Sequence, residues 1–407
     1  MYKYKKLDNG LNVILVSRES MMSAAVLFCV KAGSSKESSN DAGIFHLIEH
    51  LVFRGTKKRD AHQIKNPIEE VGGTLNAFTS KNFTVFYTKV PAIKVTESIE
   101  ILSEIVFEPL FKTEDIIKEK NIVSEEISSY EDDPINNVFE NLYKNIYDEG
   151  FARPVLGFKE TVSNLNYDVI DYYYKTFYIP ENVDVIIVGK FVEDDVLNQL
   201  NKINPTNDSR LKIDISSPII KNENVVIKKA KKDLSSSYVV RAFKASGKIT
   251  QGYYNTLILN TFLGSGMSSL LFSKLRDEEG LVYEVASDYE AYPKEGLLLF
   301  FAATSEEKLS ILIKKFQEIF SIIKDYKKME KWFNYGKNRL IGKLTLELEN
   351  NLSMALNILD LYENYGKIIT IEEFIEKLEK VKMEDVIETT ENILLSPEFI
   401  SILSPQR

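Results

Sequence analysis

The spacing of apolar and polar positions in the first half of the chain predicts a mixed set of strands and helices. Short apolar runs separated by a polar turn predict strands at residues 11–15 and 24–31. Apolar positions at helical spacing predict helices, and two more strands follow the glycine pair Gly72-Gly73. The helices are expected at residues 42–53, 61–70, 95–107 and 113–130, and the further strands at 74–79, 83–90 and 183–188.

The second half of the chain repeats this order of elements. Each element lies about 210 residues after its counterpart, and a constant offset of this kind indicates two copies of one α/β unit. Strand pairs mixed with long helices, without regular alternation, favour an α+β fold of two homologous α/β-layer domains. The repeated strands are expected at residues 238–243, 282–287, 297–303 and 399–403, and the repeated helices at 252–263 and 305–323.

A stretch rich in turn-forming residues separates the two halves. It includes Pro205, Asn207, Asp208 and Pro218, which are typical of a linker. A chain of 407 residues also suits two domains of ordinary size. We therefore expect an N-terminal domain over residues 1–205, a linker over 206–224 and a homologous C-terminal domain over 225–407.

Composition and charge exclude several classes of partner. Asp and Glu (60) outnumber Lys and Arg (51), for a net charge of −9, so no nucleic-acid partner is expected. No apolar run reaches the ~18 residues of a membrane span, and the first residues lack the apolar core of a signal peptide. We expect a cytoplasmic location and no membrane partner. The single cysteine, Cys29, lies in an apolar run and is expected to be a buried small hydrophobe.

Two of the three histidines lie in one segment, His46-Leu47-Ile48-Glu49-His50. On a helix these positions share a face, so both imidazoles and the Glu49 carboxylate point the same way. Two neutral imidazoles at this spacing can hold one Zn²⁺, and the carboxylate beside them can take a proton from water. The alternative is a surface patch with a charged Glu-His pair. The third histidine, His62, lies in a polar turn and is expected at the surface without a role.

A catalytic zinc ion needs a third protein ligand, and Cys29 is excluded because it lies on a strand among apolar residues. The helix expected at 113–130 supplies carboxylates. Glu119 and Glu126 fall on its apolar face, whereas Glu125 falls on another face. Burying two carboxylates costs on the order of several kcal/mol unless a positive charge compensates. Glu126 and Glu119 are therefore candidates for a ligand and its neighbour; the alternative is that both are half-exposed residues of an ordinary helix.

This arrangement, with Glu126 following 76 residues after His50, resembles the inverted zinc motif of the M16, or pitrilysin/insulinase, metallopeptidases. The resemblance implies that His46, His50 and Glu126 bind one Zn²⁺ ion per chain. It also implies that Glu49 is the general base and that Glu119 assists catalysis. Further segments similar to the family extend over nearly the whole chain, at residues 53–56, 72–79, 129–134, 177–182 and 275–283.

Two other groups of residues are candidates for substrate binding. Asn76, Ala77 and Phe78 lie on an expected strand behind two glycines, a suitable place for a sheet edge that an extended peptide joins. The resemblance implies that the family uses this segment in that way. It also implies that Arg276 and Tyr283, a pair spaced by seven residues, bind the substrate backbone or the tetrahedral intermediate.

The resemblance implies a zinc endopeptidase that hydrolyses short or unfolded peptides, bound in extended form in a closed chamber. The length is similar to that of short members such as mitochondrial processing peptidase, whose two domains form half of a clamshell, so a second chain is expected. Because this chain carries both the zinc motif and the Arg/Tyr pair, a homodimer is favoured over a heterodimer with an inactive paralogue.

The alternative function is a noncatalytic core-type subunit or a peptide-binding scaffold of the same fold. The presence of the complete motif in the first half argues against it. Near the positions of the second half that correspond to this motif, the chain instead has Thr256 and Asn260.

Overall fold

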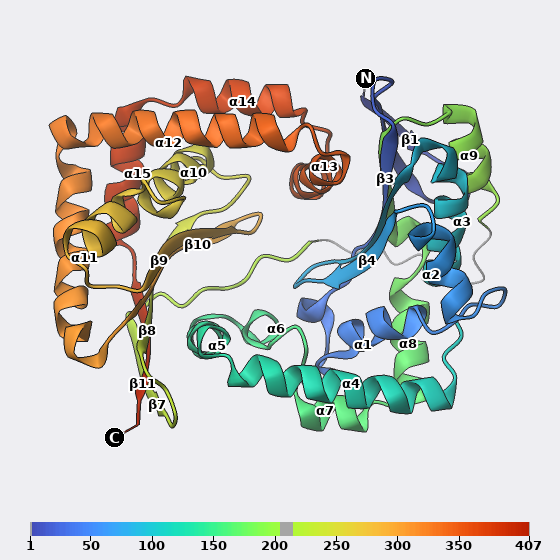
Figure 1. Cartoon of the computed structure of the whole chain (residues 1–407), viewed down its shortest axis with the longest axis horizontal. Helices are drawn as coiled ribbons and strands as arrows, with labels where there is room; N and C mark the ends of the chain where they lie inside the picture. The colour runs from blue at the N-terminus through green and yellow to red at the C-terminus, as the bar shows by residue number, and fades with distance from the viewer. Residues whose placement is uncertain (1, 204–214, 407) are drawn as a thin grey trace. The chain divides into compact units, whose positions relative to one another are not determined.

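The computed structural model describes residues 2–203 and 215–406, which form two compact units (Figure 1). The division between Ser216 and Ser217 falls inside the linker expected at 206–224, of which residues 206–214 lie outside the described residues. Over the described residues, the first unit consists of Met1–Ser128, Arg153–Ser216 and Glu347–Thr370, and the second of Ser129–Ala152, Ser217–Leu346 and Ile371–Arg407.

Each unit thus includes a segment from the other half of the chain. Ser129–Ala152 belongs to the second unit, and Glu347–Thr370 belongs to the first. The domains expected from the sequence, 1–205 and 225–407, instead assign Ser129–Ala152 to the first domain and Glu347–Thr370 to the second. The reason for the difference is long-range packing of an apolar helix face in each segment, which a local pattern does not reveal.

The first unit is built on a six-stranded sheet in the order β1-β2-β6-β3-β5-β4. Only β2 and β6 pair in parallel; the other neighbours are antiparallel. From Ala24 to Val30 every residue of β3 is buried, which requires cover on both faces of the sheet. The strands are β1 (Tyr2–Lys6), β2 (Asn12–Ser17), β3 (Ser23–Val30), β4 (Thr74–Thr79), β5 (Thr84–Pro91) and β6 (Val183–Gly189).

The helices of the first unit supply that cover. The helix α3 contacts β3 and β5, whereas α13, from the exchanged segment, contacts β3 and β6. The helix α4 begins in the first unit and runs past the division at Ser128. The helices are α1 (Ile44–Val52), α2 (Ala61–Glu69), α3 (Val95–Phe107), α4 (Thr113–Asp132), α7 (Lys159–Asn164), α8 (Tyr167–Phe177), α9 (Glu193–Asn201) and α13 (Asn351–Tyr365).

The second unit is built on a five-stranded sheet in the order β7-β11-β8-β10-β9, with only β7 and β11 parallel. This order matches β2-β6-β3-β5-β4 of the first unit strand for strand, so the internal repeat predicted from the sequence is present in the topology. The strands are β7 (Val225–Lys231), β8 (Ser237–Ser246), β9 (Glu284–Ala291), β10 (Glu295–Thr304) and β11 (Glu398–Pro405).

The exchanged helix α5 packs on the second sheet through an apolar face. Val138, Leu142 and Ile146 share a buried cluster with Val240 and Phe399. The helices of this unit are α5 (Pro134–Ile146), α6 (Glu149–Ala152), α10 (Tyr253–Gly264), α11 (Leu309–Lys324), α12 (Tyr326–Glu347), α14 (Ile371–Lys380) and α15 (Met383–Leu395), with a π-helical segment at Phe272–Glu278. Short 3₁₀ turns of the chain lie at Ser34–Lys36, Ser39–Asp41, Ala92–Lys94, Pro180–Asn182 and Glu306–Lys308.

The fold class expected from the sequence, α+β with two α/β-layer domains, is confirmed. Cys29 is fully buried on β3, as expected. Among the residues that the structure describes, no helix is both long and apolar enough to pass through a membrane.

A buried ionic cluster attaches α13 to the first sheet. The Nζ atom of Lys31 lies 2.8 Å from Oδ2 of Asp184 and 3.9 Å from Oε1 of Glu363. The two carboxyl side chains are only 1% and 3% exposed. Burial, together with the neighbouring Asp184, raises the pKa of Glu363 well above its usual range, which favours the protonated form of Glu363. Lys31 therefore balances the charge of Asp184.

We expect Lys31→Met to lower the free energy of unfolding by about 3 kcal/mol or more, because it leaves Asp184 buried without a counter-charge. Glu363→Gln imitates the protonated carboxyl group and should cost less than about 1 kcal/mol. Urea unfolding followed by circular dichroism measures both, with the exposed Lys57→Met as control. Equal losses for the Lys31 and Glu363 variants would contradict the assigned charge states.

Candidate metal centre

The helix α1 carries the two histidines and begins after Gly43, which has a φ of +94°. A Cβ atom at this position would lie 2.5 Å from the carbonyl oxygen of Leu156, so the turn requires glycine. The carboxylate of Glu37 accepts the backbone N–H groups of Gly43 and Phe45, at 2.8 and 3.1 Å. The Nη2 atom of Arg153 in turn donates to the backbone carbonyl of Glu37 at 2.6 Å. Glu37 thereby satisfies donors at the start of α1 and holds this helix in place.

Three candidate metal ligands meet between α1 and α4. The Oε2 atom of Glu126 lies 3.7 Å from Nε2 of His46 and 3.6 Å from Nε2 of His50. A tetrahedral zinc ion separates its ligand atoms by about 3.4 Å, given metal bonds of about 2.0–2.1 Å. Two imidazole nitrogens and a carboxylate oxygen therefore fit this ion with small shifts. Within residues 2–203 and 215–406, this is the one cluster of His, Cys, Asp or Glu residues with ligand atoms so placed.

His46 is in the protonation state that a metal requires. Burial, and to a smaller extent the neighbouring His50, lower the pKa of His46 to about 4. The imidazole is therefore neutral at physiological pH, and a neutral imidazole is the form that binds metal ions.

Glu119 orients His50. Its Oε2 atom lies 3.0 Å from Nδ1 of His50, and its Oε1 atom is bound by the guanidinium group of Arg54. Burial alone would raise the pKa of Glu119, but these two partners outweigh it and lower the pKa. Because Nδ1 of His50 donates to this carboxylate, the lone pair of Nε2 remains for a metal. By this geometry Glu119 is a positioning residue, and Arg54 supports it.

Glu49 lies one residue before His50 and is held by the sheet. Its Oε2 atom accepts a hydrogen bond from Oγ1 of Thr79, the last residue of β4, at 2.5 Å. Burial raises the pKa of Glu49, although the hydrogen bond from Thr79 and the nearby His50 oppose the increase. A raised carboxyl pKa suits a group that must both accept and release a proton near neutral pH.

The helical-face argument for the two carboxylates of α4 holds only in part. Both Glu119 and Glu126 reach α1, as the sequence predicts, and Glu125 is exposed and not in the cluster. However, the side chain of Glu119 is 4% exposed and that of Glu126 is 46% exposed. The expectation that a buried face selects Glu126 is therefore wrong. Glu126 lies at the flank of the buried stripe that Ile116, Glu119, Val123 and Ile127 form.

Sequence reasoning did not identify four residues that position the site: Glu37, Arg54, Thr79 and Arg153. Each acts through a contact with a segment distant in sequence, except Glu37, which lies six residues before the helix that it caps. The only available signal was that Arg54 and Thr79 lie within segments similar to the family.

The candidate substrate residues lie in both units. Asn76, Ala77 and Phe78 are on β4, which is an edge strand of the described sheet and contacts α1. Arg276 and Tyr283 belong to the second unit, where the guanidinium group of Arg276 lies 4.9 Å from the ring centroid of Phe272. Tyr283 is exposed, just before β9. The role of all five residues with a substrate stays a prediction.

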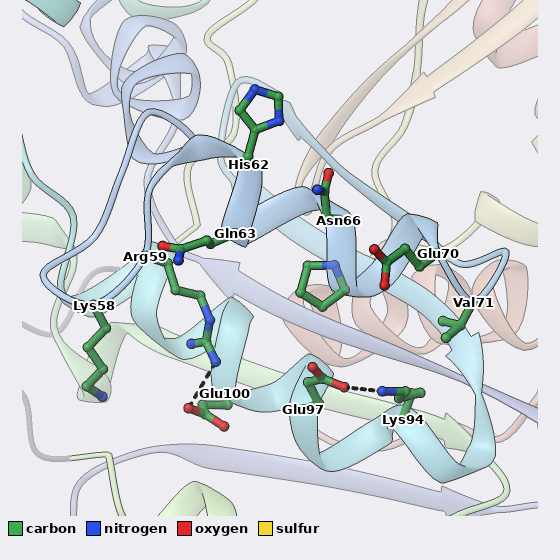
Figure 2. Close-up of a pocket in the computed structure, with 11 residues that line it drawn as sticks. Lys58, Arg59, His62, Gln63, Asn66, Glu70, Val71, Lys94, Glu97 and Glu100 are labelled. Atoms are coloured by element: carbon green, nitrogen blue, oxygen red, sulfur yellow. Dashed lines mark hydrogen bonds and ion pairs between the residues drawn. The ribbon is translucent and has the colours of Figure 1, made fainter.

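A separate hollow of the first unit lies between α2 and α3 (Figure 2). Its cations are paired: Arg59 lies 3.1 Å from Glu100, and Lys94 lies 2.7 Å from Glu97. His62 is exposed on α2 and points away from both pairs (Figure 2). The prediction that His62 lies at the surface is confirmed, although the residue belongs to the first turn of α2 rather than to a polar turn.

Two family models match successive parts of the chain. The model described as insulinase (peptidase family M16) matches residues 12–158, and the model described as the peptidase M16 inactive domain matches residues 164–340. The two matches and the fold place the chain among the two-domain peptidases. It belongs to peptidase family M16.

Relatives and solved structures match over the full length. An uncharacterized zinc protease of Bacillus subtilis, YmxG, is 29% identical over 100% of this chain and 98% of its own. An uncharacterized zinc protease of Rickettsia felis is 28% identical over 99% of this chain and 98% of its own. The crystal structure of a protease from Helicobacter pylori has a TM-score of 0.89 at 21% identity, covering 100% of this chain and 99% of that one. A Pseudomonas fluorescens structure described as a peptidase M16 inactive domain has the same TM-score at 18% identity, covering 100% and 98%; both structures support the fold alone.

The adjacent carboxylates of α4 provide a test of the ligand set. We expect Glu126→Gln to weaken Zn²⁺ binding by about 10- to 100-fold or more, since an amide is a poor replacement for a ligating carboxylate. Glu125→Gln is the matched control and should bind Zn²⁺ like the unmodified protein. Zinc content and chelator competition measure the binding by both variants. Loss of zinc in the Glu125 variant alone would show that Glu125, and not Glu126, is the ligand.

Proposed function

We propose that the protein is a zinc-dependent endopeptidase that hydrolyses short or unfolded peptides. The observation that carries this proposal is the cluster of His46, His50 and Glu126, with Glu49 on the same helix. Three protein ligands for one zinc ion per chain leave a fourth position open, as catalytic sites require. Membership of family M16 and relatives named as zinc proteases support it.

The residues around this cluster have distinct roles in the proposed reaction. Zinc, when bound, supplies a Lewis acid that polarises the scissile carbonyl group and acidifies water. Glu49 accepts the proton of the attacking water at its carboxylate and then donates it to the departing amine. Thr79 fixes the Glu49 side chain, and Glu119 fixes the imidazole of His50.

The edge strand β4 gives the substrate a place to bind. We propose that a peptide in extended form adds to β4 at Asn76, Ala77 and Phe78 through main-chain hydrogen bonds. The contact between β4 and α1, and the hydrogen bond from Thr79 to Glu49, place this edge beside the metal cluster. A peptide that must be extended to bind is short or unfolded, which gives the proposed substrate class.

The match to an inactive-domain model does not favour a noncatalytic function for the chain. That model covers residues 164–340, whereas the candidate ligands and Glu49 lie between residues 46 and 126, inside the match to the first model.

We expect Glu49→Gln to retain zinc and fold but to lose peptide hydrolysis by about 10²–10⁴-fold, because the proton acceptor is gone. A panel of quenched fluorescent peptides measures turnover, and metal analysis measures zinc. Near-normal turnover in this variant would show that Glu49 is not the general base. A zinc-loaded, unmodified protein that binds peptides but cleaves none would favour a peptide-binding scaffold instead.

We further propose that the active species is a homodimer that closes a chamber around the substrate, in which Arg276 and Tyr283 of one protomer complete the other's site. The support is the presence of both the metal cluster and this pair on one chain. Mixing His46→Ala with the double variant Arg276→Ala, Tyr283→Phe should partly restore hydrolysis, because a mixed dimer has one intact composite site. Absence of recovery, despite demonstrated subunit exchange, would exclude the shared site.

A further inference from the structure

The turn between β4 and β5, residues 80–83, is packed closely against an earlier segment of the first unit. A Cβ atom on Gly33 would lie 2.3 Å from the carbonyl oxygen of Ser80, so the two backbones are in direct contact. The backbone N–H group of Ser35 donates to the carbonyl oxygen of Lys81 at 2.8 Å. The chain that follows Gly33 is therefore fixed on this turn.

The segment 33–37 connects the turn to the helix that carries the histidines. It ends at Glu37, whose carboxylate accepts two backbone N–H groups at the start of α1. Its other end lies on the turn that directly follows Thr79, and Thr79 donates to the carboxylate of Glu49 at 2.5 Å. One short segment thus contacts both the helix that carries Glu49 and the hairpin that carries its hydrogen-bond partner. It therefore helps to set the distance between these two side chains.

Asn82 joins this segment and the turn to the end of the linker. The residue is 7% exposed, and both ends of its amide are used. Its Oδ1 atom accepts from Oγ of Ser35 at 3.2 Å and from the backbone N–H of Ser216 at 3.3 Å. Its Nδ2 atom donates to the backbone carbonyl of Ser216 at 3.0 Å. One buried amide therefore binds two other parts of the chain to the turn that follows β4.

The chain passes between the two units next to these contacts. Ser216 is the last residue of the first unit before the chain enters the second, and Arg153 is the first residue after an earlier return. Nζ of Lys81, beside Asn82, donates to the backbone carbonyl of Arg153. The guanidinium group of Arg153 donates to the backbone carbonyl of Glu37 at 2.6 Å. Both connections are thus attached to the turn and the segment that lie between β4 and α1.

We propose that Asn82 is a positioning residue for the proton-accepting side chain of Glu49. Its hydrogen bonds are to Ser35 and Ser216, so it acts through the turn and through Thr79, which directly precedes the turn. Without this amide, the segment 33–37 and the linker lose a shared partner, and Thr79 holds Glu49 less firmly. The inference rests on the proposed hydrolysis, in which Glu49 is the general base, and it leaves the zinc ligands unchanged.

The test is a double-mutant cycle on kcat, measured with quenched fluorescent peptides on the full-length, zinc-loaded protein. Asn82→Ala and Thr79→Val should each lower kcat by about 10-fold, because a small displacement of a general base is costly. The double variant should be less than about 2-fold slower than Thr79→Val alone, since the hydroxyl group through which Asn82 acts is already absent. A larger further loss, or an unchanged kcat in Asn82→Ala, would overturn the proposal.

Asn9→Ala is the matched control for the loss of an amide that fastens a turn. Asn9 lies between β1 and β2, and β1 is the edge of the sheet opposite β4. Its Nδ2 atom donates to the backbone carbonyls of Leu200 and Ile203 at 2.9 and 3.0 Å. This variant should keep the kcat of the unmodified protein even if its Tm falls as far as that of Asn82→Ala. An equal loss of kcat in both variants would show a general effect of stability and would overturn the proposal.

Hydrogen exchange followed by mass spectrometry provides a readout that does not depend on hydrolysis. Backbone amides of the segment 33–37 and of the turn 80–83 should exchange faster in Asn82→Ala but not in Asn9→Ala. Unchanged exchange there would overturn the proposal, whereas an unmodified protein that cleaves no peptide would overturn the proposed function. Ser35→Ala removes only one of the hydroxyl groups that reach Asn82, so it is the milder variant if Asn82→Ala does not fold. It should change exchange and kcat in the same direction by a smaller factor, and no change in either would count against the proposal.

Discussion

The candidate site depends on one buried contact, the carboxylate of Glu119 between His50 and Arg54. This contact joins α4 to α1, and it sets which nitrogen of His50 is free to bind a metal. It also fixes the position of α4 along α1. Glu126, two turns after Glu119, therefore lies within reach of both imidazoles. The buried Glu119 carboxylate thus helps to position Glu126, an exposed candidate ligand.

The two units share a topology but use it differently. In the first, Thr79 on β4 donates to Glu49 on α1. In the second, Ser287 on β9 donates to the side chain of Asn260 on α10, at 2.6 Å. Both copies therefore join the edge strand to the helix through a hydroxyl group, and only the first has a carboxylate as the acceptor. An amide cannot accept a proton as a base does, so the same bond is structural in one unit and suited to chemistry in the other.

Local sequence pattern predicts the elements that carry the site because their periodicity is strong. The strand at Thr74–Thr79 and the helix at Val95–Phe107 have the bounds that the sequence indicates, and α1 differs by at most two residues at each end. The spacing of His46 and His50 likewise follows from helix geometry. The exposure of Glu126, the cap supplied by Glu37 and the support from Arg54 depend on tertiary contacts, which leave no periodic signal.

The helix α13 packs against β3 and β6, although more than 160 residues of chain separate it from the nearer strand. The sheet that supports the metal cluster is therefore not fully covered until residues 351–365 are in place. During translation, which begins at the N-terminus, the first unit cannot complete its packing until most of the second unit has been synthesised. The unit that carries the candidate metal cluster is thus the first to begin translation and among the last to be completed.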